Sequence, residues 1–355
     1  RLGLFDPPEQ VPYSRIPFDV VDSDLHRALA RKAAQQSLVL LKNDGILPLR
    51  SDLRALAVIG PNADAPRVLW ANYHGTASQT VTPLAGIRAR LAPGTKLYYA
   101  EGCQPQGTEL DSCLPSGNLT EAVLLAQRAD ATVLLLGLTP QIEGEQGDAS
   151  DSAASGDKLD LALPGLQQQL LEAVIAVGKP VIVVLVSGSA LSVTYADEHA
   201  SAIVQAFYGG EEGGSALADV LFGDVSPAGR LPVTFPRSLA DLPPFEDYAL
   251  FGRTYRYSKA QPLYPFGFGL SYTRFAYSKL TLSIAVAECS AELEVDVSVR
   301  VENVGACASD EVVQLYVKAL DGSVPLPHHD LRGFSRIQLE PGAATTASFT
   351  LDARA

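Results

Sequence analysis

LLLGLTPQIEGEQGDASDSAASGDKLDLAL, residues 134–163, is the stretch that decides how the chain folds. It begins within an apolar run, 132–137, which predicts a buried strand. The strand leads into a polar loop, and helix is expected again from Pro164 because proline suits the first helical position. In open α/β sheets, sites are built in the crevice beyond the carboxyl ends of the strands. We therefore predict a functional loop here, and its acidic residues are Glu143, Glu145, Asp148, Asp151 and Asp157.

The alternation of strand and helix continues on both sides of this stretch. Apolar strands between amphipathic helices indicate a mainly parallel sheet covered on both faces, which is an α/β sandwich. Strands are expected at 55–59, 96–100, 132–137, 180–186 and 202–207, and helices at 22–39, 83–91, 120–129, 164–177 and 213–221.

Four segments are expected along the chain. Residues 1–21 contain four prolines and predict a connector from a preceding domain, and 22–235 form the α/β domain with its acidic loop. Residues 236–276 are rich in proline and aromatic residues, which favours a linker packed on both domains. From 277 to 355 apolar residues alternate with a period of two, which predicts an antiparallel β-sandwich. About five strands are expected there, fewer than the roughly seven that a sandwich uses, so this domain is expected to be incomplete.

Composition limits the partners of the chain. A net charge of −13 without a cluster of Lys and Arg argues against nucleic acid and against an anionic membrane surface, so a neutral partner such as a sugar fits better. The longest apolar runs have the length of a strand, well below the roughly 20 residues that cross a bilayer. Position 1 is Arg and the chain contains no Met, so we expect part of a longer polypeptide. Cys103 and Cys113 close a short loop and could form a disulfide, which would indicate a secreted or periplasmic protein.

Several familiar enzyme motifs do not fit. In 209–214, GGEEGG, the glycines lack the spacing of a dinucleotide-binding turn, and two glutamates would repel a pyrophosphate. The stretch 186–190, VSGSA, does not match the serine-hydrolase elbow. The five histidines lack the spacing of metal ligands. We therefore expect neither a cofactor nor a metal.

A second stretch with polar and aromatic side chains, WANYHG at 70–75, follows the first strand of the α/β region. If the sheet is parallel, Asn72 and Tyr73 lie at the same edge as the acidic loop. Aromatic rings stack on sugars, and amides form hydrogen bonds with hydroxyl groups, so these two residues are candidates for carbohydrate binding. A packed loop without a ligand is the simpler interpretation.

Glycoside hydrolysis requires a pair of carboxyl groups around the scissile bond, and in principle Glu143 and Glu145 could both supply it from this loop. One group must be protonated and the other ionised, and about 5–5.5 Å separates them in retaining enzymes. Two residues so close in a loop are, however, poorly suited to fixing that distance. On charge alone, a solvated acidic loop is again the simpler interpretation.

The chain resembles glycoside hydrolase family 3, in the subgroup of β-glucosidases and β-xylosidases. The similarity rests on collinear motifs that cover nearly the whole chain: RLGLFDP, SLVLLKNDGILPL, VIGPNAD, NYHGT, VTPLAGIR, LGLTPQIEGEQGD, GDKLDLALPGLQ, GGEEGGSALADVLFGDVSPAGRLPVTFP, GRTYRY, PLYPFGFGLSYT, DEVVQLYV and LRGFSRIQLEPG.

The resemblance implies an α/β sandwich domain followed by a fibronectin-III-like domain. It also implies an N-terminal (β/α)8 barrel, which has no counterpart in residues 1–355 and which would carry the nucleophilic Asp. The position that matches the acid/base of the family is Glu145, with Glu143 as the competing candidate. Where the family usually has Asp-Arg after this loop, this chain has Asp157-Lys158 (or, aligned otherwise, Asp148-Ala149), and a Lys loses the bidentate geometry of Arg.

The expected function is therefore retaining exo-acting hydrolysis of terminal β-D-glucosyl or β-D-xylosyl residues, with this chain supplying the acid/base half of the site. Tyr73, Asn72 and Glu143 would contribute to sugar binding. The partners implied are a β-linked oligosaccharide or aryl glycoside and the barrel, and an oligomer is possible. The alternative is a noncatalytic carbohydrate-binding or assembly fragment.

Overall fold

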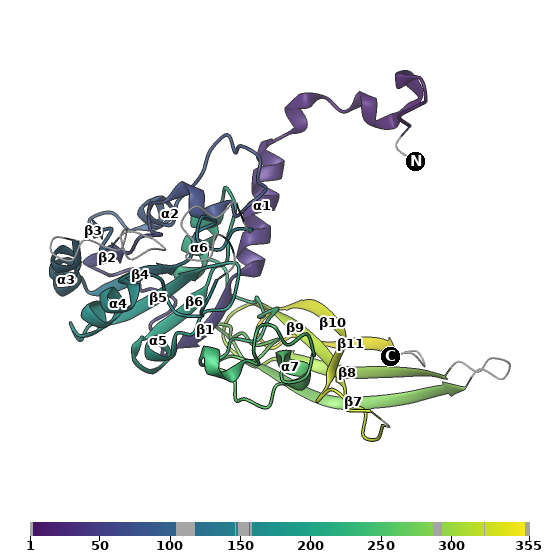
Figure 1. Ribbon diagram of the computed structural model, residues 1–355. Coiled ribbons are helices and arrows are strands. Elements are labelled where there is room, and N and C mark those ends of the chain that lie inside the picture. Colours follow the sequence, from purple (N-terminus) through teal and green to yellow (C-terminus); the bar gives the residue numbers. More distant parts are fainter. Residues whose placement is uncertain are drawn as a thin grey trace.

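The computed structural model describes residues 3–103, 118–145, 147, 156, 158–286, 293–322 and 324–351. An α/β domain is followed by a β-rich domain, and the N-terminal segment extends away from both (Figure 1). The fold class expected from the sequence is confirmed. It consists of a mainly parallel sheet between helices, followed by antiparallel sheets.

The central sheet has six strands in the order β1-β6-β5-β4-β2-β3. All neighbouring strands are parallel except β1, which pairs antiparallel with β6 at the edge. Every residue of β2, β4 and β5 is buried, because helices cover both faces of the sheet. The strands are β1 Val39–Asn43, β2 Ala55–Ile59, β3 Lys96–Ala100, β4 Ala131–Gly137, β5 Val181–Val186 and β6 Ala202–Gln205.

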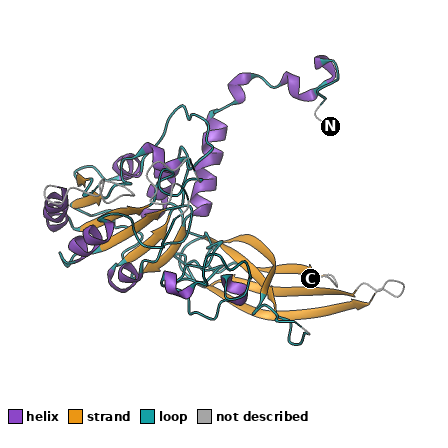
Figure 2. Cartoon of the chain, viewed as in Figure 1, coloured by secondary structure: helices purple, strands orange, loops and turns teal. Residues whose placement is uncertain are grey.

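Two hydrophobic cores lie on opposite faces of this sheet. Although β4 is apolar throughout, Leu134 and Leu136 pack in one core and Val133 and Leu135 in the other. Helices α3, α4 and α5 supply the first core, and α1, α2 and α6 supply the second (Figure 2). The helices are α1 Asp24–Ser37, α2 Pro83–Arg90, α3 Asn118–Arg128, α4 Gln167–Ile175, α5 Thr194–His199 and α6 Gly213–Leu221.

The start of β1 differs from the expectation of a helix continuing to residue 39. Helix α1 ends at Ser37, and β1 begins after the single residue Leu38. Val39 and Leu41 face one core while Leu40 faces the other, so burial in the sheet determines the conformation of this apolar run. The short helix α5 was also not expected from the sequence.

Proline and aromatic residues between the two domains pack on both of them. Phe235 is fully buried, its N–H donates to Tyr264 O (2.9 Å), and Leu270 N–H donates to Leu40 O on the outer edge of β1 (2.8 Å). Short helical turns, η5 Leu239–Asp241 and α7 Thr254–Tyr257, lie in this region. The linker therefore forms part of the packed structure.

The second domain contains two antiparallel sheets, β11-β8-β7 and β10-β9. Its core is small, and the buried residues in it are Val301, Val313, Leu339 and Ala347. A salt bridge between Arg230 and Glu311 (2.6 Å), with both side chains largely buried, joins it to the end of the α/β domain. The strands are β7 Phe275–Val286, β8 Leu293–Asn303, β9 Ser309–Val317, β10 Asp330–Leu339 and β11 Ala344–Leu351.

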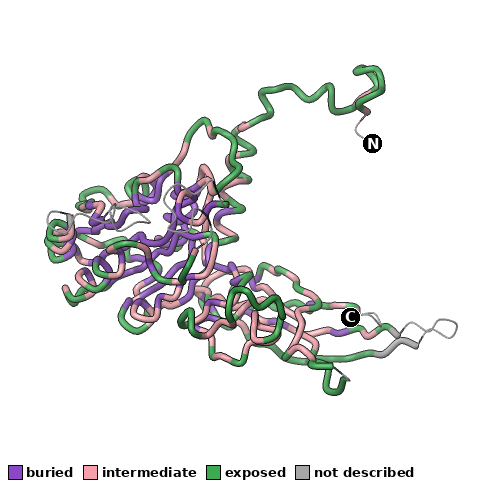
Figure 3. The backbone as a smooth tube through the Cα atoms, viewed as in Figure 1, coloured by how far each residue is buried: buried purple, intermediate pink, exposed green. Residues whose placement is uncertain are grey.

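The N-terminal segment forms three short 3-10 helices, η1 Pro8–Gln10, η2 Pro12–Arg15 and η3 Phe18–Val20, and none of their residues is buried (Figure 3). Its apolar side chains are exposed, and those on the outer face of α1, Leu25 and Leu29, are 77% and 62% exposed. The segment and this face of α1 thus present apolar surface to the outside. The exposed apolar residues of the segment are Leu4, Phe5, Tyr13, Ile16, Phe18, Val20 and Val21.

Candidate active site

The acidic loop begins where β4 leaves the sheet. Gly137 has a left-handed backbone (φ 133°), and a Cβ there would lie 2.1 Å from Val186 O, so only glycine fits. The buried side chain of Gln167 holds this residue from both sides, since Gly137 N–H donates to its Oε1 (2.7 Å) and its Nε2 donates to Gly137 O (2.9 Å). Leu138 N–H then donates to Val186 O (2.7 Å). The stem of the loop is therefore fixed to its neighbours.

The structure separates the two candidate glutamates. Glu143 points inward, between the buried residues Ile142 and Gly144, and is itself half-buried. Glu145 is exposed. Asp148, Asp151 and Asp157 lie outside the described residues, whereas Asp160, further along the same stretch, is exposed and accepts a hydrogen bond from Ala162 N–H (2.8 Å).

Three donors from two neighbouring strand ends occupy the Glu143 carboxylate. Oε1 accepts hydrogen bonds from Gly188 N–H and from the Tyr208 hydroxyl, and the latter distance is 2.5 Å. Oε2 accepts from Ser189 Oγ at 2.6 Å. Gly188 and Ser189 follow β5, whereas Tyr208 follows β6, so the contacts form at the carboxyl edge of the parallel sheet. Glu143 consequently ties the loop after β4 to the next two strands.

Lys158 stands where the chain returns from the loop. Its Nζ donates to Ala190 O at 2.7 Å, so the returning chain is held by the same turn that holds Glu143. Burial lowers the pKa of Lys158, and the nearby Glu143 carboxylate opposes that shift. The Lys158 amino group therefore lies near the Glu143 carboxylate, where the loop returns to the sheet.

Asn72 and Tyr73 lie in the loop between β2 and α2, and both side chains are exposed. Tyr73 has φ 58°, an uncommon conformation for a residue other than glycine, and its side chain is 81% exposed. Within the described part of the chain, no hydrogen bond joins either residue to Glu143 or Glu145. Their loop leaves the same edge of the sheet as the acidic loop, and the neighbouring Trp70 and His74 rings pack with centroids 5.0 Å apart.

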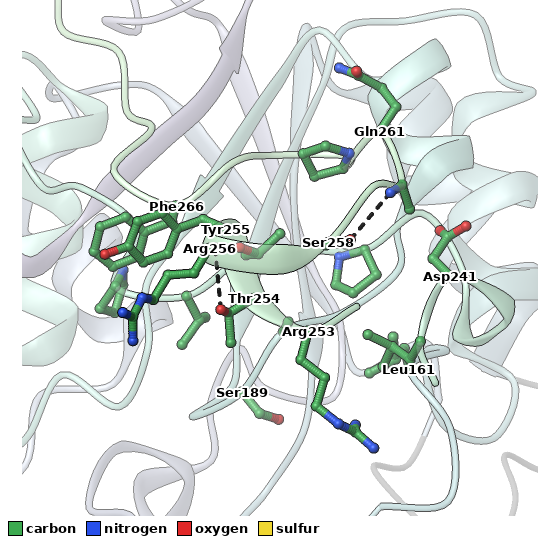
Figure 4. Close-up of a pocket in the computed structure, with 18 of the residues that line it drawn as sticks. Leu161, Ser189, Asp241, Arg253, Thr254, Tyr255, Arg256, Ser258, Gln261 and Phe266 are labelled. Atoms are coloured by element: carbon green, nitrogen blue, oxygen red, sulfur yellow. Dashed lines mark hydrogen bonds between the residues drawn. The ribbon is translucent and has the colours of Figure 1, made fainter. Parts of the chain in front are cut away.

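A cavity of about 680 Å³ borders the turn that holds Glu143, on the side of the linker (Figure 4). Ser189 and Lys158 line it on one side, and the stacked rings of Tyr255 and Phe266, 4.2 Å apart, line another part. Arg253 also lines it, but its guanidinium donates to the carbonyls of Pro244 and Asp247. The cavity therefore leaves open space beside Ser189.

Sequence reasoning did not single out the residues that hold Glu143. The stretch 186–190 drew attention only as a poor match to the serine-hydrolase elbow, and nothing in the sequence marked Tyr208. The available signal was position, because the 187–190 turn follows β5, the neighbour of β4, and Tyr208 lies just beyond β6, the next strand in the sheet. Pairing of Cys103 with Cys113 cannot be followed, because Cys113 lies outside the described residues, while Cys103 is buried.

Neither a metal-binding cluster nor a membrane-spanning helix is present among the described residues. No group of three His, Cys, Asp or Glu side chains there is placed to hold a metal ion. Nor does the described part of the chain contain a helix with the length and apolarity needed to span a membrane.

Comparison with known proteins gives consistent matches. The model of the glycosyl hydrolase family 3 C-terminal domain matches residues 38–272, and that of a fibronectin type III-like domain matches 311–355. The chain is 39% identical to a β-xylosidase of Formosa agariphila, covering 99% of this chain and 48% of that protein. It is 36% identical to a periplasmic β-glucosidase of Salmonella typhimurium, covering 100% of this chain and 49% of that one.

Solved structures agree with these matches. A β-glucosidase of Erythrobacter marinus superimposes with a TM-score of 0.82 at 38% identity, covering 98% of this chain and 48% of that one. The chain spans about half the length of the curated relatives it matches. By its sequence, its domains and its fold, the chain belongs to glycoside hydrolase family 3.

Proposed function

We propose that this chain supplies the acid/base half of the active site of a retaining, exo-acting β-glycosidase. The substrate is a terminal, non-reducing β-D-glucosyl or β-D-xylosyl residue of an oligosaccharide or aryl glycoside. Support comes from the relatives, which are named β-xylosidase and β-glucosidase. The observation that carries the proposal is the contrast between Glu145, exposed at the carboxyl edge of the sheet, and Glu143, whose two oxygens are already bonded within the fold.

The proposed mechanism uses two carboxyl groups on different segments. An Asp on an N-terminal (β/α)8 barrel outside this chain attacks the anomeric carbon, while protonated Glu145 donates its proton to the departing glycosidic oxygen. Water then attacks the glycosyl-enzyme intermediate, and Glu145 takes a proton from that water as general base. An exposed carboxyl group suits this role, because it can meet a substrate held on another segment.

The barrel is expected to pack against the exposed apolar residues of the N-terminal segment and of α1. Leu25 and Leu29 on the outer face of α1, together with the apolar residues of 3–21, form a surface that a packed partner would bury. Asn72 and Tyr73, exposed at the same edge as Glu145, would form the rim of the sugar subsite. The periplasmic location of one named relative supports a secreted or periplasmic enzyme.

The test is Glu145→Gln in the intact enzyme that carries this chain. Glutamine cannot donate a proton, so kcat/KM for substrates with poor leaving groups, such as disaccharides, should fall by roughly 10²–10⁴-fold. The dinitrophenolate of a dinitrophenyl glycoside departs without being protonated, so kcat/KM for this substrate should stay within about tenfold of wild type. Added azide should restore turnover of the activated substrate and yield a glycosyl azide.

Glu143→Gln is the comparison variant. If Glu143→Gln gives the full pattern with azide rescue, the acid/base is Glu143 and the assignment to Glu145 is wrong. If neither variant does so, the loop is not catalytic. Glucoside and xyloside versions of both substrates, assayed side by side on the wild type, determine the preferred sugar.

A further inference from the structure

Tyr208 and Ser189 hold Glu143, and Glu143 lies two residues before the proposed acid/base. We propose that Tyr208 and Ser189 are positioning residues for Glu145, acting through the Glu143 carboxylate, and that Glu143 itself serves as an anchor. This inference rests on the proposed function. Neither hydroxyl needs to contact substrate for it to hold.

The Glu143 carboxylate acts as an acceptor on both oxygens. Gly188 N–H and the Tyr208 hydroxyl donate to Oε1, and the Ser189 hydroxyl donates to Oε2. Burial raises the pKa of the Tyr208 phenol well above its usual value, and the Glu143 carboxylate adds to that rise. Because the ordinary pKa of tyrosine is already about 10, the Tyr208 hydroxyl is protonated at neutral pH and can donate to Glu143.

The backbone carries this anchoring to Glu145. Two residues of extended chain span at most about 7 Å, so Glu145 cannot move far from a fixed Glu143. Gly144, between them, is buried, and Ile142 packs in the hydrophobic core. Glu145 is thus the point at which a fixed stem reaches the surface.

The anchoring turn is itself held in place. The buried side chain of Gln205, the last residue of β6, donates from Nε2 to Ser187 O and Ser187 Oγ (both 3.1 Å). Phe207, just before Tyr208, has φ 52°, a conformation that is unfavourable for residues other than glycine and persists only where the surroundings impose it. The returning chain is tied to the same turn, through Lys158 Nζ to Ala190 O (2.7 Å) and Ser192 N–H to Leu161 O (2.7 Å). Both stems of the loop therefore depend on one platform.

The experiment uses Tyr208→Phe in the intact enzyme, with kcat/KM measured for a disaccharide and for a dinitrophenyl glycoside. Loss of the hydroxyl loosens Glu143 and hence the proton donor, so kcat/KM for the disaccharide should fall roughly tenfold. The activated glycoside needs no proton, so its kcat/KM should change less than about twofold. Selective loss on the poor leaving group is the result expected of a positioning residue.

Tyr264→Phe is the matched control. The Tyr264 hydroxyl donates to Asp197 Oδ1 at 2.6 Å, which is the same kind of tyrosine–carboxylate bond. Asp197 lies on α5, which leads into the start of β6 and so to the opposite edge of the sheet. Tyr264→Phe should leave the ratio of the two kcat/KM values unchanged.

Ser189 gives a second, independent test. Ser189→Ala removes the hydroxyl that bonds Oε2, and Ser189→Thr keeps a hydroxyl while its methyl group can enter the adjoining cavity. Ser189→Ala should reproduce the selective loss, and Ser189→Thr should restore the wild-type ratio. If Tyr208→Phe does not fold, as judged by thermal melting, the Ser189 pair decides the question.

The outcomes distinguish this inference from the proposed function. Suppose that Glu145→Gln shows leaving-group selectivity and azide rescue, but that Tyr208→Phe and Ser189→Ala lower kcat/KM equally for both substrates or for neither. The positioning role is then wrong, and the acid/base assignment stands. If Glu145→Gln itself shows no selectivity, the proposed function is wrong, whatever Tyr208→Phe does.

Discussion

Replacing Gly188 with alanine should displace the Glu143 carboxylate and, by a smaller amount, the ring of Tyr208. A Cβ at position 188 would lie 2.7 Å from Glu143 Oε1 and 3.1 Å from Tyr208 Cε2, whereas ordinary contact begins at 3.4 Å. The carboxylate must therefore retreat by about 0.7 Å. The backbone at Gly188 is not in the left-handed region, so alanine adds no conformational strain there.

A shift of this size is large for the loop that carries the proposed proton donor. Misplacing a reacting group by about 1 Å can cost about 10²-fold in rate, so a retreat of about 0.7 Å, partly absorbed along two residues, should lower kcat/KM for a disaccharide by roughly 10–100-fold. Overpacking should also reduce the free energy of unfolding by about 1–3 kcal/mol. The dinitrophenyl glycoside should be much less affected.

A double-mutant cycle with Glu143→Ala tests the cause. Without the carboxylate, the new methyl group meets only the Tyr208 ring, at 3.1 Å, so Gly188→Ala should cost much less in the Glu143→Ala background than in the wild type. Kinetics on both substrates for the four proteins, with urea unfolding as the check on folding, complete the cycle. If the two losses multiply, the methyl group acts by another route and the reasoning is refuted.

Two further predictions concern the parts that support the site. The buried Asp219 carboxylate accepts hydrogen bonds from Arg31 Nε (2.7 Å), Arg31 Nη2 (2.5 Å) and Gln35 Nε2 (2.6 Å). Arg31→Met leaves it with Gln35 alone, so the free energy of unfolding should fall by roughly 2–3 kcal/mol. The cost is moderated because the Arg31 side chain is 42% exposed. Urea unfolding measures this free energy, and the stability of Arg31→Lys should lie between those of the wild type and Arg31→Met. A loss below about 1 kcal/mol for Arg31→Met would contradict a stabilising role for the Arg31–Asp219 pair. Gln167→Leu should cost roughly 2–4 kcal/mol, because Gly137 loses a buried partner for both its N–H and its C=O. A melting temperature equal to that of wild type would show that the two groups find other partners.

Much of the α/β domain was predictable because its signal is local. The runs that became β2, β4 and β5 are apolar throughout and separated by amphipathic helices, so their burial between helical layers followed from composition. The position of the acidic loop at the carboxyl edge followed from the same alternation. Strand β1 could not be predicted in this way, because its apolar residues follow α1 after one residue. Its pairing with β6 joins Val39 to Gln205, far along the chain.

The distinction between the two glutamates required the structure. Two carboxyl groups two positions apart in a loop are equivalent in sequence, because loop residues have no fixed periodicity to assign one of them inward. The deciding contact comes from Tyr208, 65 residues away, brought to Glu143 by the parallel order of β4, β5 and β6. Sequence could therefore predict a functional loop and name its two candidate glutamates, whereas tertiary contacts give those two side chains different environments.

The hydrogen bond between the linker and the outer edge of β1 matters for where the protein can be truncated. Leu270 N–H pairs with Leu40 O, and Arg336 of the second domain donates to Gln36 O at the end of α1 (2.9 Å). Removing the chain after Phe235 would leave the outer hydrogen-bonding groups of β1 free to pair with another molecule. The covalent boundary between the two domains is thus a poor place to cut, because residues beyond it shield the sheet before it from self-association.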